Sequence, residues 1–287
     1  MHCSTKTDFQ QTLSNFSFQE NVIIKPNWVS NEPGEFSEPV ILDWLLSAFP
    51  SHNKIIIESY TPWRGFDFKV DDLDKSEVTS LEGGKNHWEL YKKQDEQFLS
   101  STGIEAVLKK HNASYLNITN EVWQEECVDP QIIKRLVEKD CHHIKWEQLF
   151  SYIPKKLFEI RENSTLISLS KIKIEESIPE ILVSMSMKNL FGLIPHPSRW
   201  VPFHENGHAD VANVIKDLYK IYSSIFDDSV WIAEGILTMV KHYCEPTQEI
   251  VRDQGLLFVG KNAIKVDSMA CEAVGIDPKQ VPHLVGI

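Results

Sequence analysis

Short apolar runs recur along the chain at intervals that leave room for helices between them. The runs at residues 21–24 and 54–57 flank a segment, 40–49, that has helical character and stops at Pro50. Strand, helix and strand in this order are typical of a βαβ unit, whose two strands lie parallel in one sheet. The same pattern predicts further strands at 113–118, 166–170, 230–233 and 256–259, and helices at 103–110, 211–225 and 268–274.

Two polar residues are placed to cap predicted helices. Ser37 stands shortly before the helix at 40–49 and suits its N-cap. Asp267 directly precedes the helix at 268–274, which Gly275 ends. Together with the strand pattern, these signals predict an α/β fold class, with a Rossmann-like, mostly parallel sheet flanked by helices.

Two stretches lack a clear period. Residues 121–160 are charged and poorly patterned, and we expect a connection between two parts of the fold there. The stretch at about 60–100 mixes aromatic, charged and glycine residues, and it is either a binding lid or an insertion that only covers the core. We predict one α/β domain over residues 1–287, with two candidate halves at 20–160 and 161–287.

The central segment 184–208 (SMSMKNLFGLIPHPSRWVPFHENGH) gathers many polar donors in a short stretch. Lys188 and Asn189 precede an apolar sequence in which Gly192 permits a close approach of the backbone. Three prolines prevent one continuous helix, so a mainly loop-like region is predicted, where binding and catalytic residues often occur. The alternative is a structural loop with partly exposed histidines. The other candidate groups in this segment are His196, Arg199, His204 and His208.

Ionisable and amide side chains follow several of the predicted strands. In an open parallel sheet, ligands bind outside the carboxyl ends of the strands, so polar residues there are better candidates than those elsewhere. Charged strand ends also serve solubility, and the coincidence of several therefore carries more weight than any single one. The residues at these ends are Lys25, Asn27, Glu58, Lys171, Lys173 and Glu234.

The residue types at these ends favour binding of an anion. Lysines and an amide beside apolar walls suit the carboxylate or phosphate of a small ligand. A partly desolvated lysine also acts as a base or a nucleophile when its pKa is lowered. Glu58 and Glu234 would balance the positive charge, bind a metal or carry protons. The alternative is that these lysines and glutamates only form structural ion pairs.

His204 and His208 have the H-E-x-x-H spacing of zinc proteases, in the sequence HENGH. That motif needs a helix to place both histidines on one face, and Asn206-Gly207 is poor helix material. No third ligand follows nearby in the sequence, so we interpret the spacing as a chance match and leave the metal content open. The sequence carries no glycine-rich nucleotide-binding motif, serine-hydrolase elbow or kinase signature.

Charge and cysteine content narrow the classes of partner. The formal net charge of −12 and the isoelectric point near 5.4 argue against nucleic acid and anionic membrane as partners. A local basic pocket for a small anion is compatible with them. The five cysteines are widely spaced without a CxxC pair, so an iron–sulfur cluster is not expected. An odd cysteine count without a signal pattern or a membrane-spanning apolar run predicts a cytoplasmic protein.

Several stretches resemble one protein family, the domain-of-unknown-function family numbered 362. In the first half these are VIIKPNW, GEFSEPVILDWLL and IIIES; in the second half they are ISLSKIKI, SMKNLFGLIP, WIAEGI and LLFVGKNAIKVDSMACEAVGID. The resemblance runs from about residue 22 to 280 and leaves 60–100 and 121–160 unmatched. It implies a fold and a site more than a reaction. Its most specific elements are Lys25-Pro26-Asn27, Lys188-Asn189 with Gly192, and Val266-Asp267.

Two departures from the family limit what the resemblance implies. Ile174-Glu175 follows Lys173 where family members commonly have Thr-His, so a histidine role at that position is not carried over. Many members also carry a ferredoxin-like module with clustered cysteines, which is absent from this sequence. Electron transfer that depends on such a cluster is therefore not carried over either.

These observations predict an enzyme that acts on a small anionic metabolite bearing a carboxylate or a phosphate. The alternative is a non-catalytic accessory protein that binds a metal or a cofactor. The reaction class and the identity of any cofactor stay open. The predicted catalytic residues are Lys188, Lys25, His196, His204 and Glu234, and the predicted substrate-binding residues are Asn27, Ser37, Glu58, Lys171, Lys173, Asn189 and His208.

Overall fold

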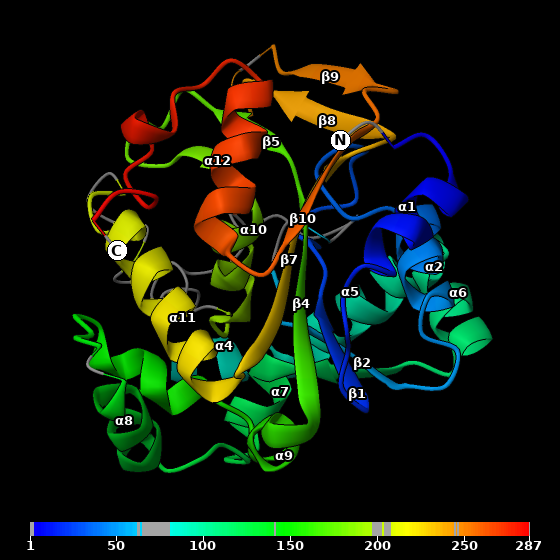
Figure 1. The fold of residues 1–287 in the computed structure, drawn as a ribbon. Helices are drawn as coiled ribbons and strands as arrows, with labels where there is room; N and C mark the ends of the chain where they lie inside the picture. The colour runs from blue at the N-terminus through cyan, green and yellow to red at the C-terminus, as the bar shows by residue number, and fades with distance from the viewer. Residues whose placement is uncertain are drawn as a thin grey trace.

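A six-stranded sheet forms the centre of the molecule, with strand order β10-β7-β4-β1-β2-β3 (Figure 1). All neighbouring strands pair in parallel except β10, which runs antiparallel to β7. The α/β class with a mostly parallel sheet is therefore confirmed. The strands span Asn21–Lys25 (β1), Asn53–Glu58 (β2), Ser114–Asn117 (β3), Ser164–Lys171 (β4), Asp228–Gly235 (β7) and Leu256–Gly260 (β10).

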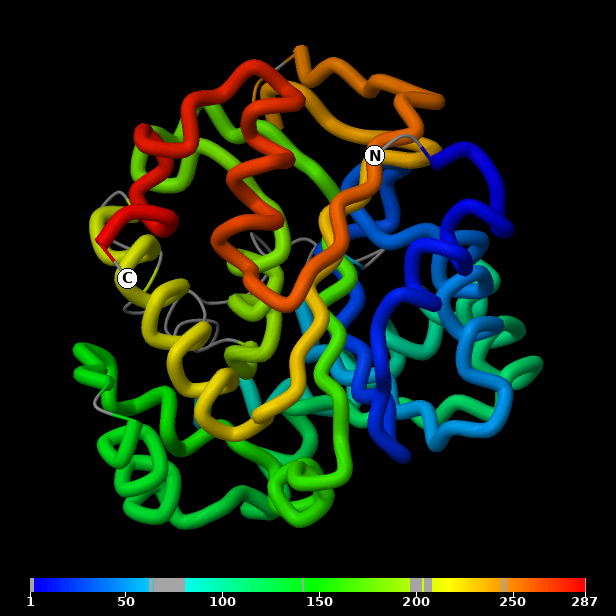
Figure 2. The backbone as a smooth tube through the Cα atoms, in the orientation of Figure 1, coloured from blue at the N-terminus to red at the C-terminus, as the bar shows by residue number. Residues whose placement is uncertain are grey.

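The computed structural model describes residues 3–61, 64, 81–140, 142–196, 203, 208–243, 245 and 247–286. Within these ranges the N-terminal residues lie beside the start of β10, where the Cys3 amide donates to the carbonyl of Gly255 at 2.6 Å. In Figure 2 the blue N-terminal chain begins next to the orange strand β10, which comes late in the sequence. No helix in the described part of the chain is both long enough and apolar enough to cross a membrane.

Helices cover both faces of the sheet (Figure 1). Alternate residues of a strand point to opposite faces, so Val22 and Ile24 pack into one core and Ile23 into the other. One core is shared with α1 (Lys6–Leu13), α2 (Pro39–Ser47), α5 (Trp88–Ser101) and α6 (Ile104–His111). The other is shared with α10 (Ser186–Asn189), α11 (Val211–Ile225) and α12 (Ala263–Ala273).

A second, four-stranded sheet with the order β6-β5-β8-β9 was not predicted. It continues from the central strands of the first sheet: Ile172 alone separates β4 from β5, and Ile236 and Leu237 separate β7 from β8. The second sheet therefore lies beyond the carboxyl ends of β4 and β7 (Figure 1). Its strands span Lys173–Glu175 (β5), Leu182–Ser184 (β6), Thr238–Lys241 (β8) and Glu249–Arg252 (β9).

The stretch at 121–160, for which the sequence predicted only a connection and no regular element, is largely helical. Asn117 caps α7, because its side-chain oxygen accepts from the amides of Thr119 and Asn120 at 3.0 and 3.4 Å. Asp129 caps α8 in the same way, with Pro130 in the first turn. The elements of this region are α7 (Ile118–Trp123), α8 (Pro130–Lys139), a 3₁₀ helix η3 (Glu147–Tyr152), α9 (Lys155–Ile160) and η4 (Arg161–Asn163).

The irregular stretch predicted at about 60–100 is also helical in its described part. Two helices follow one another there, α4 (Leu81–Lys85) and α5. Tyr91 of α5 packs on Tyr60 and Trp123, so this segment covers the core beside β2 and β3. Residues 62, 63 and 65–80 lie outside the described residues, and the choice between a lid and an insertion stays open for them.

The central segment begins with two short helices rather than a loop. These are α10 and the 3₁₀ helix η5 (Leu190–Leu193). Residues 197–202 and 204–207 lie outside the described residues, so Arg199 and His204 receive no structural account. Beyond this segment, α11 matches the predicted helix at 211–225, and a last 3₁₀ helix η6 (Pro278–Gln280) follows α12.

Candidate functional site

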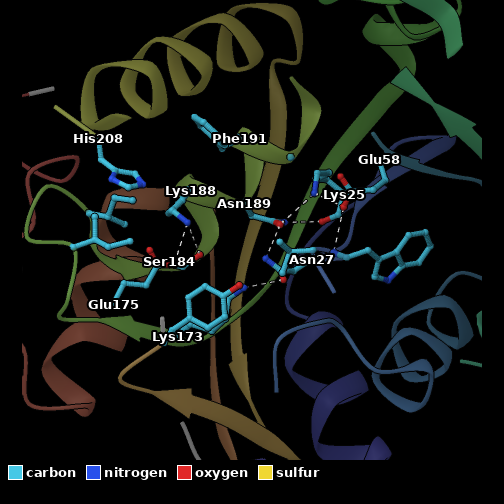
Figure 3. A pocket seen from close by; sticks show the side chains of 16 residues that line it. Lys25, Asn27, Glu58, Lys173, Glu175, Ser184, Lys188, Asn189, Phe191 and His208 are labelled. Atoms are coloured by element: carbon cyan, nitrogen blue, oxygen red, sulfur yellow. Dashed lines mark hydrogen bonds and ion pairs between the residues drawn. The ribbon is translucent and has the colours of Figure 1, made fainter. Parts of the chain in front are cut away.

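A cavity of about 450 Å³ lies between the carboxyl ends of β1 and β2 and the second sheet (Figure 3). The central segment and the second sheet supply most of its remaining wall. Its polar lining consists of Lys25, Asn27, Glu58, Lys173, Glu175, Ser184, Lys188, Asn189 and His208. Its other lining residues are Trp28, Val29, Ile178, Ile181, Phe191, Gly192 and Tyr243.

Lys25 and Glu58 form a buried ion pair at one end of the cavity (Figure 3). The Lys25 amine donates to a carboxylate oxygen of Glu58 at 2.8 Å, and the two side chains are only 1% and 2% exposed. It also donates to the carbonyl of Pro26 at 2.6 Å and to the amide oxygen of Asn189 at 3.3 Å. Lys25 thus has acceptors for its three protons, which fixes the amine in place. The two residues meet because they end neighbouring strands, β1 and β2, which run parallel and so finish at the same edge of the sheet.

Two side-chain amides tie the strand ends to α10. The Asn189 amide nitrogen donates to the carbonyl of Lys25 at 2.8 Å and to the hydroxyl of Ser168 at 3.0 Å. Its amide oxygen accepts from Asn27 at 3.4 Å. Because Ser168 and Lys25 face each other across the β1–β4 pair, this network fixes Asn189 relative to both strands.

Ser37 supports this network from outside the cavity. Its hydroxyl accepts from the backbone amide of Asn27 at 2.9 Å and donates to the backbone carbonyl of Leu169 at 3.2 Å. The predicted N-cap role was wrong, because the N-cap of α2 is Glu38. Ser37 is fully buried and is not among the described residues that line the cavity. Its contacts position Asn27.

Gly192 allows η5 to pass directly over the Lys25–Glu58 pair. A Cβ atom at this position would lie 2.6 Å from the Lys25 amine nitrogen and 2.8 Å from a Glu58 carboxylate oxygen. Both distances are shorter than real Cβ contacts, so only glycine fits without displacing the pair. The predicted close approach of the backbone at Gly192 is therefore confirmed.

Lys188 and Glu175 form a second ion pair on the opposite side of the cavity (Figure 3). The Lys188 amine lies 3.1 Å from a carboxylate oxygen of Glu175 and 3.4 Å from the hydroxyl oxygen of Ser184. The Glu175 side chain is 1% exposed, whereas that of Lys188 is 16% exposed. Lys188 is thus accessible from the cavity while its carboxylate partner lies behind it.

Lys173 lies between the two ion pairs. Its amine donates to the amide oxygen of Asn27 and to the carbonyl of Glu35, both at 3.3 Å. It also lies 4.9 Å from the ring centroid of Tyr243, within the range of a cation–π contact. Lys173 and Glu175 line the same cavity because residues i and i+2 of a strand share a face.

Lys171 and Glu234 are placed elsewhere. Lys171 pairs with Glu234 at 2.8 Å and with Glu38, and neither Lys171 nor Glu234 is among the described lining residues. Ser168 is level with Lys25 in the sheet, so Lys171, three residues further on, points to the opposite face. Burial opposes the charged form of Lys171, but the carboxylates of Glu234 and Glu38 outweigh it and raise the pKa of its amine. These residues form a structural ion cluster on the face that carries α2.

His196 and His208, the two predicted histidines in the described part of the chain, lie in different places. His208 lines the cavity, with a positive φ of 66°. His196 is buried, and its ring nitrogen Nε2 lies 3.0 Å from the Tyr91 hydroxyl. Its backbone amide donates to the hydroxyl of Thr119 at 3.3 Å. These contacts place His196 against α5 and α7 rather than at the cavity. Within the described ranges, no three His, Cys, Asp or Glu side chains are arranged to hold a metal ion, and the catalytic role of His204 stays a prediction.

Asp267 has a different role from the predicted N-cap of its own helix. Helix α12 begins at Ala263 with Asn262 as its cap, so Asp267 lies inside the helix. Its carboxylate accepts from the amide and the hydroxyl of Ser186 at 2.9 and 2.6 Å, and from the amide of Met187 at 2.9 Å. Asp267 therefore caps the first turn of α10, the helix that carries Lys188 and Asn189 into the cavity.

Burial raises the pKa of Asp267 to about 6, against an ordinary value of 3.8, although hydrogen bonds from Met187 and Ser186 oppose the shift. A raised pKa means that this group stabilises the folded state most below pH 3.8 and that this stability is lost as the pH rises through 6. Asn at this position does not titrate. The free-energy difference between the parent protein and Asp267→Asn should therefore shift in favour of the parent by about 1 kcal/mol between pH 7 and pH 5. Urea unfolding at both pH values measures it, and a constant difference would contradict the raised pKa.

Sequence reasoning missed two polar lining residues of the cavity, Glu175 and Ser184, and a buried histidine, His283, that does not line it. Glu175 was recorded only as a departure from the family, yet its spacing of two from Lys173 in a strand was a signal for a shared face. Ser184 had no signal, because β6 spans only Leu182–Ser184. His283 is fully buried, and neither ring nitrogen has a hydrogen-bond partner in the described part of the chain. Burial and the charges of Lys188 and Lys216 lower its pKa to about 3, so it adds no charge beside Lys188.

The fold and the cavity define an α/β protein whose lysine-lined pocket lies at the carboxyl ends of parallel strands. The chain belongs to the family described as "Domain of unknown function (DUF362)", whose model matches residues 22–272. The resemblance found in the sequence is thereby confirmed. Neither the curated proteins nor the solved structures contain a match to this chain.

Proposed function

We propose that this protein is an enzyme that acts on a small anionic metabolite bound in the cavity through its carboxylate or phosphate. The observation that carries the proposal is the convergence of three lysine amines and two side-chain amides on one cavity of about 450 Å³. Cavities of this size hold small metabolites, and fixed cationic donors in a partly apolar enclosure bind anions more strongly than exposed ones do.

The three lysines have different surroundings, which suggests a division of roles. Lys25 is held by Glu58, Pro26 and Asn189, and it is suited to fixing the electrostatic field at one end of the cavity. Lys188 is the more exposed amine and has the buried carboxylate of Glu175 directly behind it. The carboxylate of Glu175 stabilises the protonated amine, so Lys188 can bind the anionic group of the substrate and donate a proton to it. We assign proton transfer to Lys188 and orientation of the substrate to Lys173 and Asn27.

A ligand screen tests the binding half of the proposal. Acetate, benzoate, succinate, inorganic phosphate and phenyl phosphate are each added to the parent protein, and the melting temperature is followed. At least one anion should raise it, because ligand binding to the folded state alone is stabilising. The double variant Lys188→Met/Glu175→Gln removes the amine without leaving a buried carboxylate unpaired, and its affinity for the bound anion should fall at least about tenfold.

The matched control for this screen is Lys109→Met. Lys109 also pairs with a glutamate, Glu105, but its side chain is 73% exposed on the outside of α6. This variant should keep the affinity of the parent. An anion that binds the double variant as tightly as the parent would show that the cavity around Lys188 is not the binding site.

Solvent exchange tests the catalytic half. The anions that bind are incubated with the protein in D₂O, and their mass is followed. A protonated Lys188 that donates to the bound carboxylate would favour loss of an acidic carbon-bound proton to solvent. Deuterium would then enter the ligand from D₂O, and the double variant would not catalyse this exchange. Retention of a bound metal or small molecule without any turnover, seen by native mass spectrometry with elemental analysis, would instead support the accessory-protein alternative.

A further inference from the structure

The formal charges of the described side chains that line the cavity do not sum to zero. Among its described lining residues are three lysines, Lys25, Lys173 and Lys188, and two glutamates, Glu58 and Glu175. With the imidazole of His208 left out of the count, one positive charge remains. A ligand with a single negative charge would neutralise it, whereas a doubly charged phosphate would leave an excess negative charge in a partly apolar enclosure.

The position of the anion follows from the exposure of the donors. Lys188 is the accessible amine, and the Ser184 hydroxyl oxygen already accepts from it at 3.4 Å. The hydroxyl proton of Ser184 has no acceptor within the described ranges. It can therefore donate to a ligand. Lys188 and Ser184 thus present two donors at one point of the cavity wall (Figure 3). The carboxylate of Glu175 lies 3.1 Å behind the amine, and its charge disfavours a second negative charge at that point.

The rest of the wall is apolar or aromatic. Ile178 and Ile181 belong to the connection between β5 and β6, next to Ser184, and Phe191 closes the cavity from η5. Trp28 and Val29 line it beside β1. Such walls favour a ligand with apolar surface, because binding removes that surface from water. A ligand that is only a charged group would leave this surface without a partner.

We infer that the cavity takes a monocarboxylate with an alkyl or aryl body, whose carboxylate is bound by Lys188 and the hydroxyl of Ser184. This inference rests on the proposed function and narrows its substrate class from carboxylates and phosphates to singly charged carboxylates. It also assigns Ser184 as a specificity-determining residue.

Isothermal titration calorimetry with paired probes tests the substrate class. The pairs are phenylacetate with phenyl phosphate and butyrate with butyl phosphate, and acetate, inorganic phosphate and phenylacetamide serve as references. The better monocarboxylate should bind at least about tenfold more tightly than its phosphate partner and than acetate. Phenylacetamide, which has the body without the charge, should bind at least tenfold more weakly than phenylacetate.

Ser184→Ala tests the position. It should weaken binding of the better monocarboxylate about tenfold and leave that of phenylacetamide unchanged, since only the charged group is proposed to contact the hydroxyl. Ser100→Ala, an exposed serine of α5, is the control and should change neither affinity. Equal affinity of the parent and Ser184→Ala for the monocarboxylate would overturn the assignment of Ser184.

The outcomes separate this inference from the proposed function. Tighter binding of either phosphate than of its carboxylate partner, with dependence on Lys188, would overturn the monocarboxylate class and leave an anion-binding enzyme in place. Equal affinity for phenylacetate and phenylacetamide, with butyrate no tighter than acetate, would also overturn it. If none of the anions binds in a way that depends on Lys188, the proposed function fails together with the inference.

Discussion

Replacing Lys25 by methionine is expected to lower the free energy of unfolding by about 3–5 kcal/mol, because it leaves the carboxylate of Glu58 buried without its counter-ion. Glu58 is 2% exposed, and its carboxylate also accepts from the amides of Trp28 and Ser59 at 3.2 and 3.0 Å. Two amides do not replace a full positive charge in this environment. The variant also removes a donor to Pro26. Urea unfolding at pH 7 measures the loss.

Two further variants separate the effect of the unpaired Glu58 carboxylate from the general effect of removing a buried lysine. In Lys25→Met/Glu58→Gln the stranded charge is gone, and we expect most of the lost stability to return. Lys54→Met removes another buried lysine of the same sheet, whose amine donates only to the carbonyls of Phe49 and His52, each at 3.0 Å. It should cost about 1–2 kcal/mol. If Lys25→Met costs no more than Lys54→Met, the ion pair does not hold this end of the cavity together.

The main sheet was predictable because its central strands are buried on both faces and therefore contain nearly unbroken apolar runs. Sequence patterns located all six strands to within a few residues, but they did not fix which face each strand-end residue occupies. Lys171 and Glu234 were grouped with Lys25 on the rule that ligands bind at the carboxyl ends of strands. The register pairs Lys25 with Ser168, and this pairing sends Lys171 to the other face. Register depends on contacts between distant segments, which one sequence does not display.

The second sheet was missed for a different reason. Its strands have three or four residues each, too few for an alternating pattern to stand out from chance. β5 and β8 continue directly from β4 and β7, which pair in parallel, and they pair in parallel in turn. This tertiary effect places Glu175 beside Lys188. The sequence therefore indicated the lysines of the candidate site but not the carboxylate that pairs with the most accessible of them.

The helices at 121–160 show a failure that sequence reasoning could have avoided. Asp129-Pro130 is a standard helix start, and Ile133 and Val137 are four residues apart and buried on one face of α8. Frequent charged residues on the other face obscured this pattern. For Asp267, by contrast, no local signal distinguishes the cap of its own helix from the cap of α10, because its partners Ser186 and Met187 lie about eighty residues away in the sequence.

Gly192→Ala should damage both the fold and the site. The new Cβ would lie within 3 Å of the Lys25 amine and of a Glu58 carboxylate oxygen, and these atoms cannot move aside without breaking the hydrogen bonds that they make with Pro26, Asn189 and the Ser59 amide. Overpacking of this kind costs about 1–3 kcal/mol. We expect a loss near the upper end of that range, together with at least a tenfold loss of affinity for the bound anion, measured by urea unfolding and calorimetry.

Gly235→Ala separates this effect from the general effect of replacing a glycine. Gly235 ends β7, and a Cβ there would have its nearest neighbour at 3.6 Å, which is ordinary van der Waals contact. The backbone at Gly192 and at Gly235 is compatible with alanine, because neither has a positive φ. Gly235→Ala should therefore stay within about 0.5 kcal/mol of the parent. A Gly192→Ala protein with parental stability and affinity would mean that Lys25 and Glu58 can rearrange freely, and a fixed ion pair at that end of the cavity would no longer be tenable.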